Sequence, residues 1–163
     1  MSAVVSMSAS MPPTWSLVKE IRKNSSEYLQ KGSHSSVDFD AVIMVVSELV
    51  ENAVKYGVRA SDGTCVDFSL SVHGSRVKIT VKNGIEKLED YESVIFALDA
   101  IHGPRSSEEL YRSRLLQIYD SPIDEKGRLG LYRIAYEGGF DIACQLESDL
   151  IKLTAWRDFN HEA

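Results

Sequence analysis

The sequence predicts an α+β protein, a two-layer α/β sandwich in which one mixed sheet of about four to five strands carries helices on one face. Two observations support this prediction. Apolar and polar side chains alternate over residues 66–81 and again over residues 140–155, as in two hairpins that each have one buried face. Apolar residues recur at helical spacing in the segments before and between the hairpins. One layer of helices on one side of a single sheet would bury both hairpins.

Length and charge narrow the class of protein. The 163 residues fit one domain. We expect residues 1–13 to form an N-terminal strand or tail and residues 14–163 to form that domain. The formal charge of −6 and the lack of a basic stripe argue against a nucleic-acid binder. No apolar run approaches the length of a membrane span, and the N-terminus lacks the features of a secretory signal. We therefore expect a cytoplasmic protein with no membrane partner.

The cysteines and histidines predict neither a redox site nor a metal site. Cys65 and Cys144 lie far apart in the chain and lack CxxC spacing, so we expect two reduced thiols. The histidines are scattered, with no pair at metal-ligand spacing, which argues against zinc.

Two helices are expected before the first hairpin. Thr14 is the predicted N-cap of the first helix, which stops at Gly32. Ser35 followed by Asp38 resembles a capping box at the start of the second helix, which Gly57 closes. The second helix has the clearer apolar stripe, made of Phe39, Val42, Val46, Leu49, Val50 and Ala53.

The first hairpin has a two-residue turn, "GS", and the "KNG" at residues 82–84 is expected to break its second strand. A helix follows over about residues 91–101. "SSEE" at residues 106–109 resembles a capping box that opens a further helix. We predict a loop over residues 121–130 and a helix over residues 131–139 that ends at two glycines. The chain then ends in the second hairpin, which has an "SD" turn.

The stretch "ELVENAVKYG" in the second helix carries the candidate site. Glu48 and Asn52 are four residues apart, so they share one face of the helix, opposite the apolar stripe. One interpretation is a solvated face that includes a Glu51–Lys55 pair. The other is a ligand site, because Asn is a poor residue for a solvated helix interior and its amide oxygen can coordinate a hard cation.

Glycine-bearing segments supply a second signal. "KNGI" follows a strand, and "KGRLGLYRI" enters a helix. Glycines at a helix start allow backbone N–H groups to approach phosphates. Gly84 and Gly127 are also explained by an ordinary turn and an ordinary loop. Gly130 is harder to dismiss, because glycine inside a helix costs about 1 kcal/mol relative to alanine.

Taken in order, these segments resemble motifs of the GHKL ATPase superfamily, which includes gyrase and the histidine kinases. "ELVENAVKYG" resembles its N-box, "VKNGI" its first glycine box and "GRLGL" its second. The order of elements is similar to that of the bacterial anti-sigma factor serine kinases. The resemblance covers about residues 14–156 and implies a Bergerat-type, histidine kinase-like ATPase domain that takes ATP and Mg²⁺.

The resemblance also implies roles for single residues. Asn52 would hold the magnesium that bridges the phosphates, and Glu48 would be the catalytic general base. A lid over the nucleotide would span about residues 88–126. The remaining cofactor-binding positions implied by the glycine boxes are Asn83, Gly84, Gly127, Arg128, Gly130 and Leu131.

Two positions depart from the family pattern. The first box usually begins with an aspartate that accepts the adenine amino group, and the matching residue here is Lys82. An ammonium group only donates, so that hydrogen bond would be lost and ATP binding weakened. Arg128 stands where the second box usually has glycine, and it would either block or directly contact phosphate.

Three functions therefore compete. The first is a bacterial partner-switching regulator, similar to an anti-sigma factor, with weak or degenerate ATP binding and a sigma factor or a STAS-type antagonist as partner. The second is an active Mg-ATP-dependent serine/threonine protein kinase acting on such an antagonist. The third is a nucleotide-free adaptor or sensor domain. Lys82 favours the first and third, and Glu48 with Asn52 favours the first two. A histidine kinase is disfavoured, because no dimerisation domain with a phosphoacceptor histidine is evident. A homodimer is compatible with the sequence.

Overall fold

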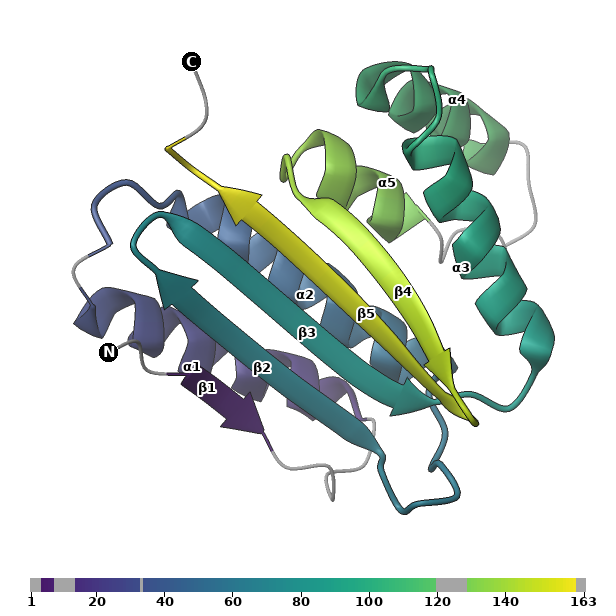
Figure 1. Cartoon of the computed structure of the whole chain (residues 1–163), viewed down its shortest axis with the longest axis horizontal. Coiled ribbons are helices and arrows are strands. Elements are labelled where there is room, and N and C mark those ends of the chain that lie inside the picture. Colours follow the sequence, from purple (N-terminus) through teal and green to yellow (C-terminus); the bar gives the residue numbers. More distant parts are fainter. Residues whose placement is uncertain (1–3, 8–13, 33, 120–128, 161–163) are drawn as a thin grey trace.

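Five strands form one sheet, and helices lie against one of its faces (Figure 1). The computed structural model describes residues 4–7, 14–32, 34–119 and 129–160. The elements in chain order are β1 (Val4–Met7), α1 (Trp15–Lys31), α2 (Phe39–Tyr56), β2 (Val66–His73), β3 (Arg76–Gly84), α3 (Leu88–Ile101), α4 (Ser107–Tyr119), α5 (Leu129–Tyr136), β4 (Asp141–Glu147) and β5 (Leu150–Asp158).

The predicted two-layer α+β architecture is confirmed. The strand order is β1-β2-β3-β5-β4, so the two predicted hairpins join edge to edge through the β3–β5 pair, in which Ile79 lies opposite Ala155. Every neighbouring pair of strands is antiparallel, and the prediction of a mixed sheet was therefore wrong. The reason is that each pair within a hairpin is antiparallel by necessity, and the hairpins meet through strands of opposite direction.

The "KNG" segment does not break the second strand. β3 continues to Gly84, which pairs with Leu150, because β5 extends alongside and supplies hydrogen-bond partners to the end of the strand. Non-local pairing thus overrides the local turn signal of Asn83 and Gly84. Both predicted turns are present: residues 74–75 separate β2 from β3, and residues 148–149 separate β4 from β5.

Three helix starts differ from the prediction: the cap of α2, the start of α3 at Leu88 rather than near residue 91, and the start of α5 at Leu129 rather than at residue 131. α1 follows Thr14 as expected and ends before Gly32, although Thr14 makes no side-chain capping bond. α2 begins after Asp38, whose carboxylate accepts a hydrogen bond from the Ala41 amide at 3.1 Å. Asp38 is therefore the N-cap itself, and Ser35, three residues earlier, lies in the preceding turn.

α2 packs its apolar stripe on the sheet, and the predicted lid helices join the same core. Figure 1 shows α1 and α2 behind the sheet and α3 and α4 at the side of α5. Val94, Ala97 and Leu98 of α3 are buried, as is Leu110 of α4. The predicted cap of α4 is present, since the Ser106 hydroxyl accepts a hydrogen bond from the Glu109 amide at 3.1 Å. Within the described part of the chain, no helix is long and apolar enough to cross a membrane.

Candidate functional site

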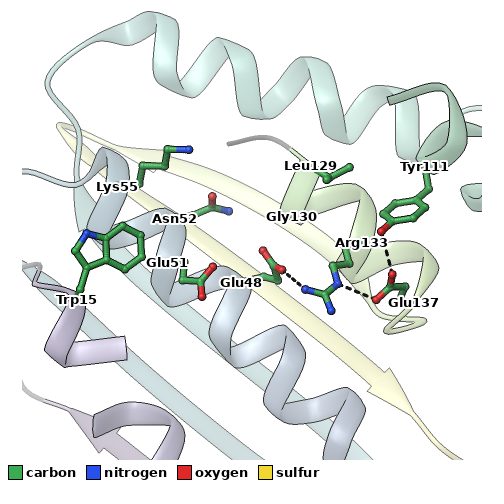
Figure 2. Close-up of a pocket in the computed structure, with 10 residues that line it drawn as sticks. All are labelled: Trp15, Glu48, Glu51, Asn52, Lys55, Tyr111, Leu129, Gly130, Arg133 and Glu137. Atoms are coloured by element: carbon green, nitrogen blue, oxygen red, sulfur yellow. Dashed lines mark hydrogen bonds and ion pairs between the residues drawn. The ribbon is translucent and has the colours of Figure 1, made fainter. Parts of the chain in front are cut away.

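A pocket of about 340 Å³ lies between α2 and α5 (Figure 2). Its volume is at the lower end of the range for sites that hold small molecules. Most of its lining side chains are polar or charged. They are Trp15, Glu48, Glu51, Asn52, Lys55, Tyr111, Leu129, Gly130, Arg133 and Glu137.

α2 supplies one wall of this pocket. Glu48 and Asn52 are one helical turn apart and point the same way, while Leu49, Val50 and Ala53 are buried on the sheet side of the helix. The side chain of Glu48 is only 16% exposed and Asn52 is 9% exposed. Neither residue therefore lies on an ordinary solvated helix face.

The first turn of α5 forms the facing wall. A Cβ atom added to Gly130 would lie 2.5 Å from Glu48 Oε2, so the glycine allows α5 to approach the Glu48 carboxylate closely. The first backbone N–H groups of a helix have no partner within the helix and carry partial positive charge. The pocket thus combines carboxylates on α2 with the N-terminal end of α5.

Arg133 joins the two walls. Its Nη1 donates to Glu48 Oε1 at 2.8 Å, and its Nε donates to Glu137 Oε2 at 2.7 Å. The Tyr111 hydroxyl on α4 donates to Glu137 Oε1 at 3.0 Å. Figure 2 shows the resulting chain of interactions from α2 through α5 to α4. One guanidinium group therefore bridges the carboxylates of Glu48 and Glu137.

The network shifts the pKa values of the pocket residues in different directions. Two hydrogen bonds raise the pKa of Arg133, the larger effect coming from Glu137 and the smaller from Glu48, so its guanidinium stays charged. The Arg133 hydrogen bond lowers the pKa of the Glu137 carboxyl. Burial, and then the hydrogen bond to Glu137, raise the pKa of the Tyr111 hydroxyl. Burial and the nearby Glu48 charge raise the pKa of Glu51, which makes no ion pair among the described residues.

Asn52 has an unsatisfied polar group. Its Nδ2 atom is buried and has no hydrogen-bond partner within the described residues. Buried amide groups are nearly always paired, and a group without a protein partner is often completed by a ligand or water. An oxygen-rich ligand in the pocket would supply the missing acceptor.

The first glycine box lies beside this pocket and does not line it. Asn83 is 5% exposed and donates from Nδ2 to the Gly84 carbonyl at 2.9 Å. Gly84 packs against the loop at Val58 and Ala60, where an added Cβ would meet the Val58 carbonyl and come within 2.7 Å of the Ala60 nitrogen. Gly84 therefore permits contact between two protein segments, and the expectation that it approaches a nucleotide is not supported by its position.

A second, much smaller cavity separates Asn52 from Asn83. Its volume is about 20 Å³, enough for about one water molecule. α3 closes it with Asp90 and Val94. The full lining is Asn52, Tyr56, Asn83, Ile85, Asp90, Val94, Ile151 and Leu153.

Lys82 does not face either cavity, which corrects the role assigned to it from the sequence. Its neighbours Val81 and Asn83 are buried on the helix side of β3, so Lys82 points to the opposite face of the sheet. It lies there beside Lys152 of β5. The alternation of buried and exposed residues along β3 decides this, and the loss of an adenine contact cannot be attributed to Lys82.

The other predicted positions divide as follows. Leu131 is fully buried in the core and does not line the pocket, because it lies on the sheet-facing side of α5. Gly127 and Arg128 lie outside the described residues, as does the last part of the predicted lid. Of the predicted positions, the pocket therefore brings together Glu48, Asn52 and Gly130.

The sequence interpretation missed the residues that contact Glu48 from other helices. Arg133 is three residues after Gly130, so a helix that presents Gly130 to the pocket also presents Arg133. That spacing was a usable signal. Glu137 follows one turn later, whereas Tyr111 gave no signal because its place depends on the packing of α4 on α5.

The chain matches no known family model and no curated protein sequence. Among the described residues, no group of three or more His, Cys, Asp or Glu side chains is arranged to hold a metal ion by itself. Neither Cys65 nor Cys144 forms a disulfide bond within the described residues.

Proposed function

We propose that this chain is a cytoplasmic bacterial signalling regulator of the partner-switching type, built on a Bergerat-type ATPase fold, that binds a magnesium nucleotide weakly. The observation that supports this most directly is the meeting of Glu48, Asn52 and the first turn of α5 in one pocket. Its protein partner would be a sigma factor or a STAS-type antagonist, as the resemblance to anti-sigma factor kinases implies.

The phosphate groups of the nucleotide would lie at the start of α5. The N–H groups at a helix start attract anions, and Gly130 adds no side chain of its own to this turn. The buried Nδ2 of Asn52 would donate to a phosphate oxygen, which satisfies the amide that has no partner in the protein.

Asn52 would also be the protein ligand of magnesium, through its amide oxygen. Magnesium is commonly held by one or two protein oxygens together with phosphates and water, so the lack of a three-carboxylate cluster among the described residues fits this arrangement. When bound, the ion neutralises phosphate charge. The carboxylates of Glu48 and Glu51 would otherwise repel the phosphates.

The base of the nucleotide would enter at the small cavity between Asn52 and Asn83. The Asn83 Nδ2 is already used by the Gly84 carbonyl, which leaves Oδ1 as the acceptor for an amino group on the base. The cavity of about 20 Å³ requires Asp90 and Val94 to move with α3 before a base can enter. The free energy of that movement would reduce affinity for the nucleotide.

We infer that phosphoryl transfer is slow, because Glu48 is engaged by the protein. Glu48 Oε1 accepts the hydrogen bond from Arg133, and Glu48 Oε2 lies against Gly130. A general base needs an oxygen within hydrogen-bond reach of the proton that it removes. Arg133 would have to release Glu48 before a serine hydroxyl could bind to it.

Calorimetric titration of the purified chain with ATP, with and without Mg²⁺, tests the nucleotide proposal. We expect weak, Mg²⁺-dependent binding that Asn52→Ala abolishes and that the exposed control Asn160→Ala preserves. If no nucleotide binds to the unmodified chain, the adaptor function without nucleotide replaces this proposal. If both asparagine variants bind as well as the unmodified chain, Asn52 is not a ligand-binding residue.

An active serine/threonine kinase is the second candidate, and the position of Glu48 beside Asn52 favours it. Transfer of the ATP γ-phosphate to a purified STAS-type protein would measure this activity. The regulator proposal expects nucleotide binding with little transfer. Rapid transfer that Glu48→Gln abolishes, with ATP binding retained, would establish the kinase instead.

A further inference from the structure

The face of the sheet that the helices leave uncovered has a lysine cluster of unusual geometry. Lys82 on β3 lies directly opposite Lys152 on β5, and Lys78 lies four residues before Lys82 on the same face. Like charges directly opposite one another on adjacent strands destabilise a sheet. A structural role for the Lys82–Lys152 pair is therefore disfavoured, and an anionic binding partner would explain it.

None of these three ammonium groups forms an ion pair with another described residue. Asp67 on β2 is the other neighbour of Lys82 across the strands, but no ion pair joins them. Arg76, further along β3, is paired with Asp158 at 3.5 Å. The centre of the face thus holds three unpaired positive charges on a chain whose formal charge is −6.

Trp156 gives this lysine face an apolar centre. It lies directly opposite Lys78 and is 41% exposed. Two hollows of about 380 and 430 Å³ share Lys78 and Trp156, so they adjoin at the indole ring. Exposed tryptophan is frequently the anchor of a protein interface, because it buries a large apolar area with little loss of side-chain freedom.

We propose that this lysine face binds an extended, acidic segment of a protein partner. Side chains of an extended segment alternate between two faces, so acidic residues at every second position would all face the sheet. Their carboxylates would pair with Lys78, Lys82 and Lys152, and an apolar part of the segment would cover Trp156. This interaction does not depend on nucleotide binding, because the helix layer lies on the other face of the sheet.

Single-stranded nucleic acid fits this face less well. Its phosphates form a continuous chain of charge and its bases need successive stacking platforms. Among the described residues, this face has one exposed aromatic ring, and carboxylates interrupt it: Asp67 lies opposite Lys82 and Asp141 lies opposite Trp156. A peptide can place its carboxylates on the lysines and avoid these acidic positions.

Fluorescence anisotropy with a labelled peptide of alternating glutamate and serine tests the proposal on the full chain. The matched peptide of alternating glutamine and serine serves as the uncharged control. We expect the glutamate peptide to bind and the glutamine peptide not to bind. Reversal of charge with Lys82→Glu and Lys152→Glu, each made separately, is expected to weaken binding about tenfold or more.

The control variants are Lys19→Glu and Lys23→Glu, which make the same change in net charge on the exposed side of α1. They are expected to leave binding unchanged. Lys152→Glu has a second readout, because it places a glutamate opposite Lys82 while its other cross-strand neighbour, Gln145, is uncharged: the melting temperature should rise while peptide binding falls. This combination separates a binding role from unfolding.

Three results would overturn the proposal. The first is an equal loss of binding in the α1 variants, which would show attraction to overall charge. The second is equal binding of the glutamine peptide. The third is binding of single-stranded oligothymidine with the same lysine dependence in the absence of peptide binding, which would assign the face to nucleic acid.

Discussion

The pocket at Glu48 and the small cavity at Asn83 adjoin the same residue, Asn52, yet they are built differently. The pocket has a volume of about 340 Å³ and is lined mostly by charged and polar side chains. The cavity has a volume of about 20 Å³ and is closed by α3. In the proposed nucleotide site, the phosphate end is therefore formed in advance, whereas the end for the base is filled by the protein. Binding would depend on displacement of α3.

The two glycines next to these cavities show the same contrast. Gly84 is surrounded by backbone atoms of Val58 and Ala60, which cannot move without disturbing the sheet end. Gly130 faces the end of the flexible Glu48 side chain. The region at Gly84 is thus a structural junction, and the region at Gly130 is adaptable.

The largest expected effect comes from the two corresponding alanine variants. Gly84→Ala should lower the free energy of unfolding by about 1–3 kcal/mol, because the new methyl group overlaps backbone atoms. Gly130→Ala should change it by less than about 1 kcal/mol, since Glu48 can move and alanine favours the helix. Urea unfolding of both variants measures the difference. Equal destabilisation would contradict the contrast between the two regions.

A smaller effect is expected when the charged network of the pocket is broken. Arg133→Ala should cost about 0.5–1 kcal/mol, a value reduced because the Arg133 side chain is 42% exposed and screened by solvent. Glu48→Gln alone should cost less, and in the double variant Arg133→Ala should have a smaller effect than in the unmodified chain. A double-mutant cycle in urea measures this coupling. Full additivity would indicate that the 2.8 Å contact contributes nothing to stability.

The two buried asparagines should respond differently to alanine. Asn83→Ala should cost about 1 kcal/mol, because the hydrogen bond to the Gly84 carbonyl is lost. Asn52→Ala should be nearly neutral in the absence of ligand, because its Nδ2 has no protein partner to lose. Thermal unfolding without nucleotide provides the comparison. A larger cost at Asn52 than at Asn83 would show that Asn52 has a structural function.

The smallest effect concerns pH and has opposite signs at two carboxylates of the pocket. The pKa of Glu137 is lowered by Arg133, so its stabilising contribution is present above about pH 4.5 and is lost as pH falls through the lowered value. The pKa of Glu51 is raised by burial, so the folded state favours its protonated carboxyl. This contribution to stability is present below about pH 4.5 and is lost as pH rises through the raised value.

Melting temperatures of Glu137→Gln and Glu51→Gln, measured at acidic and at neutral pH, test whether the two carboxyls affect stability in opposite directions. At neutral pH, Glu137→Gln should lower the melting temperature and Glu51→Gln should raise it slightly. At a pH below the lowered pKa of Glu137 both differences should shrink, since both carboxyls are then protonated in the folded and the unfolded state. A destabilising Glu51→Gln at neutral pH would mean that the Glu51 charge is used in a favourable contact.

Much of the fold followed from local patterns in the sequence. Period-two alternation predicted both hairpins, and helical spacing predicted the five main helical segments, because each pattern reflects one buried face. The same rule placed Glu48 and Asn52 together on α2. The alternation Val77, Ile79, Val81 also determined that Lys82 points away from the helices, although the motif resemblance suggested otherwise.

Tertiary structure decided the properties that depend on distant residues. Arg133 contacts Glu48 across 85 positions of the chain, and Tyr111 reaches Glu137 from another helix. The extension of β3 to Gly84 required β5 alongside, against the local turn signal. Whether a base can enter beside Asn83 depends on how α3 packs on the sheet and on α5. Periodicity determines which face of an element is buried, but the partner that buries it is set by contacts between segments far apart in the chain.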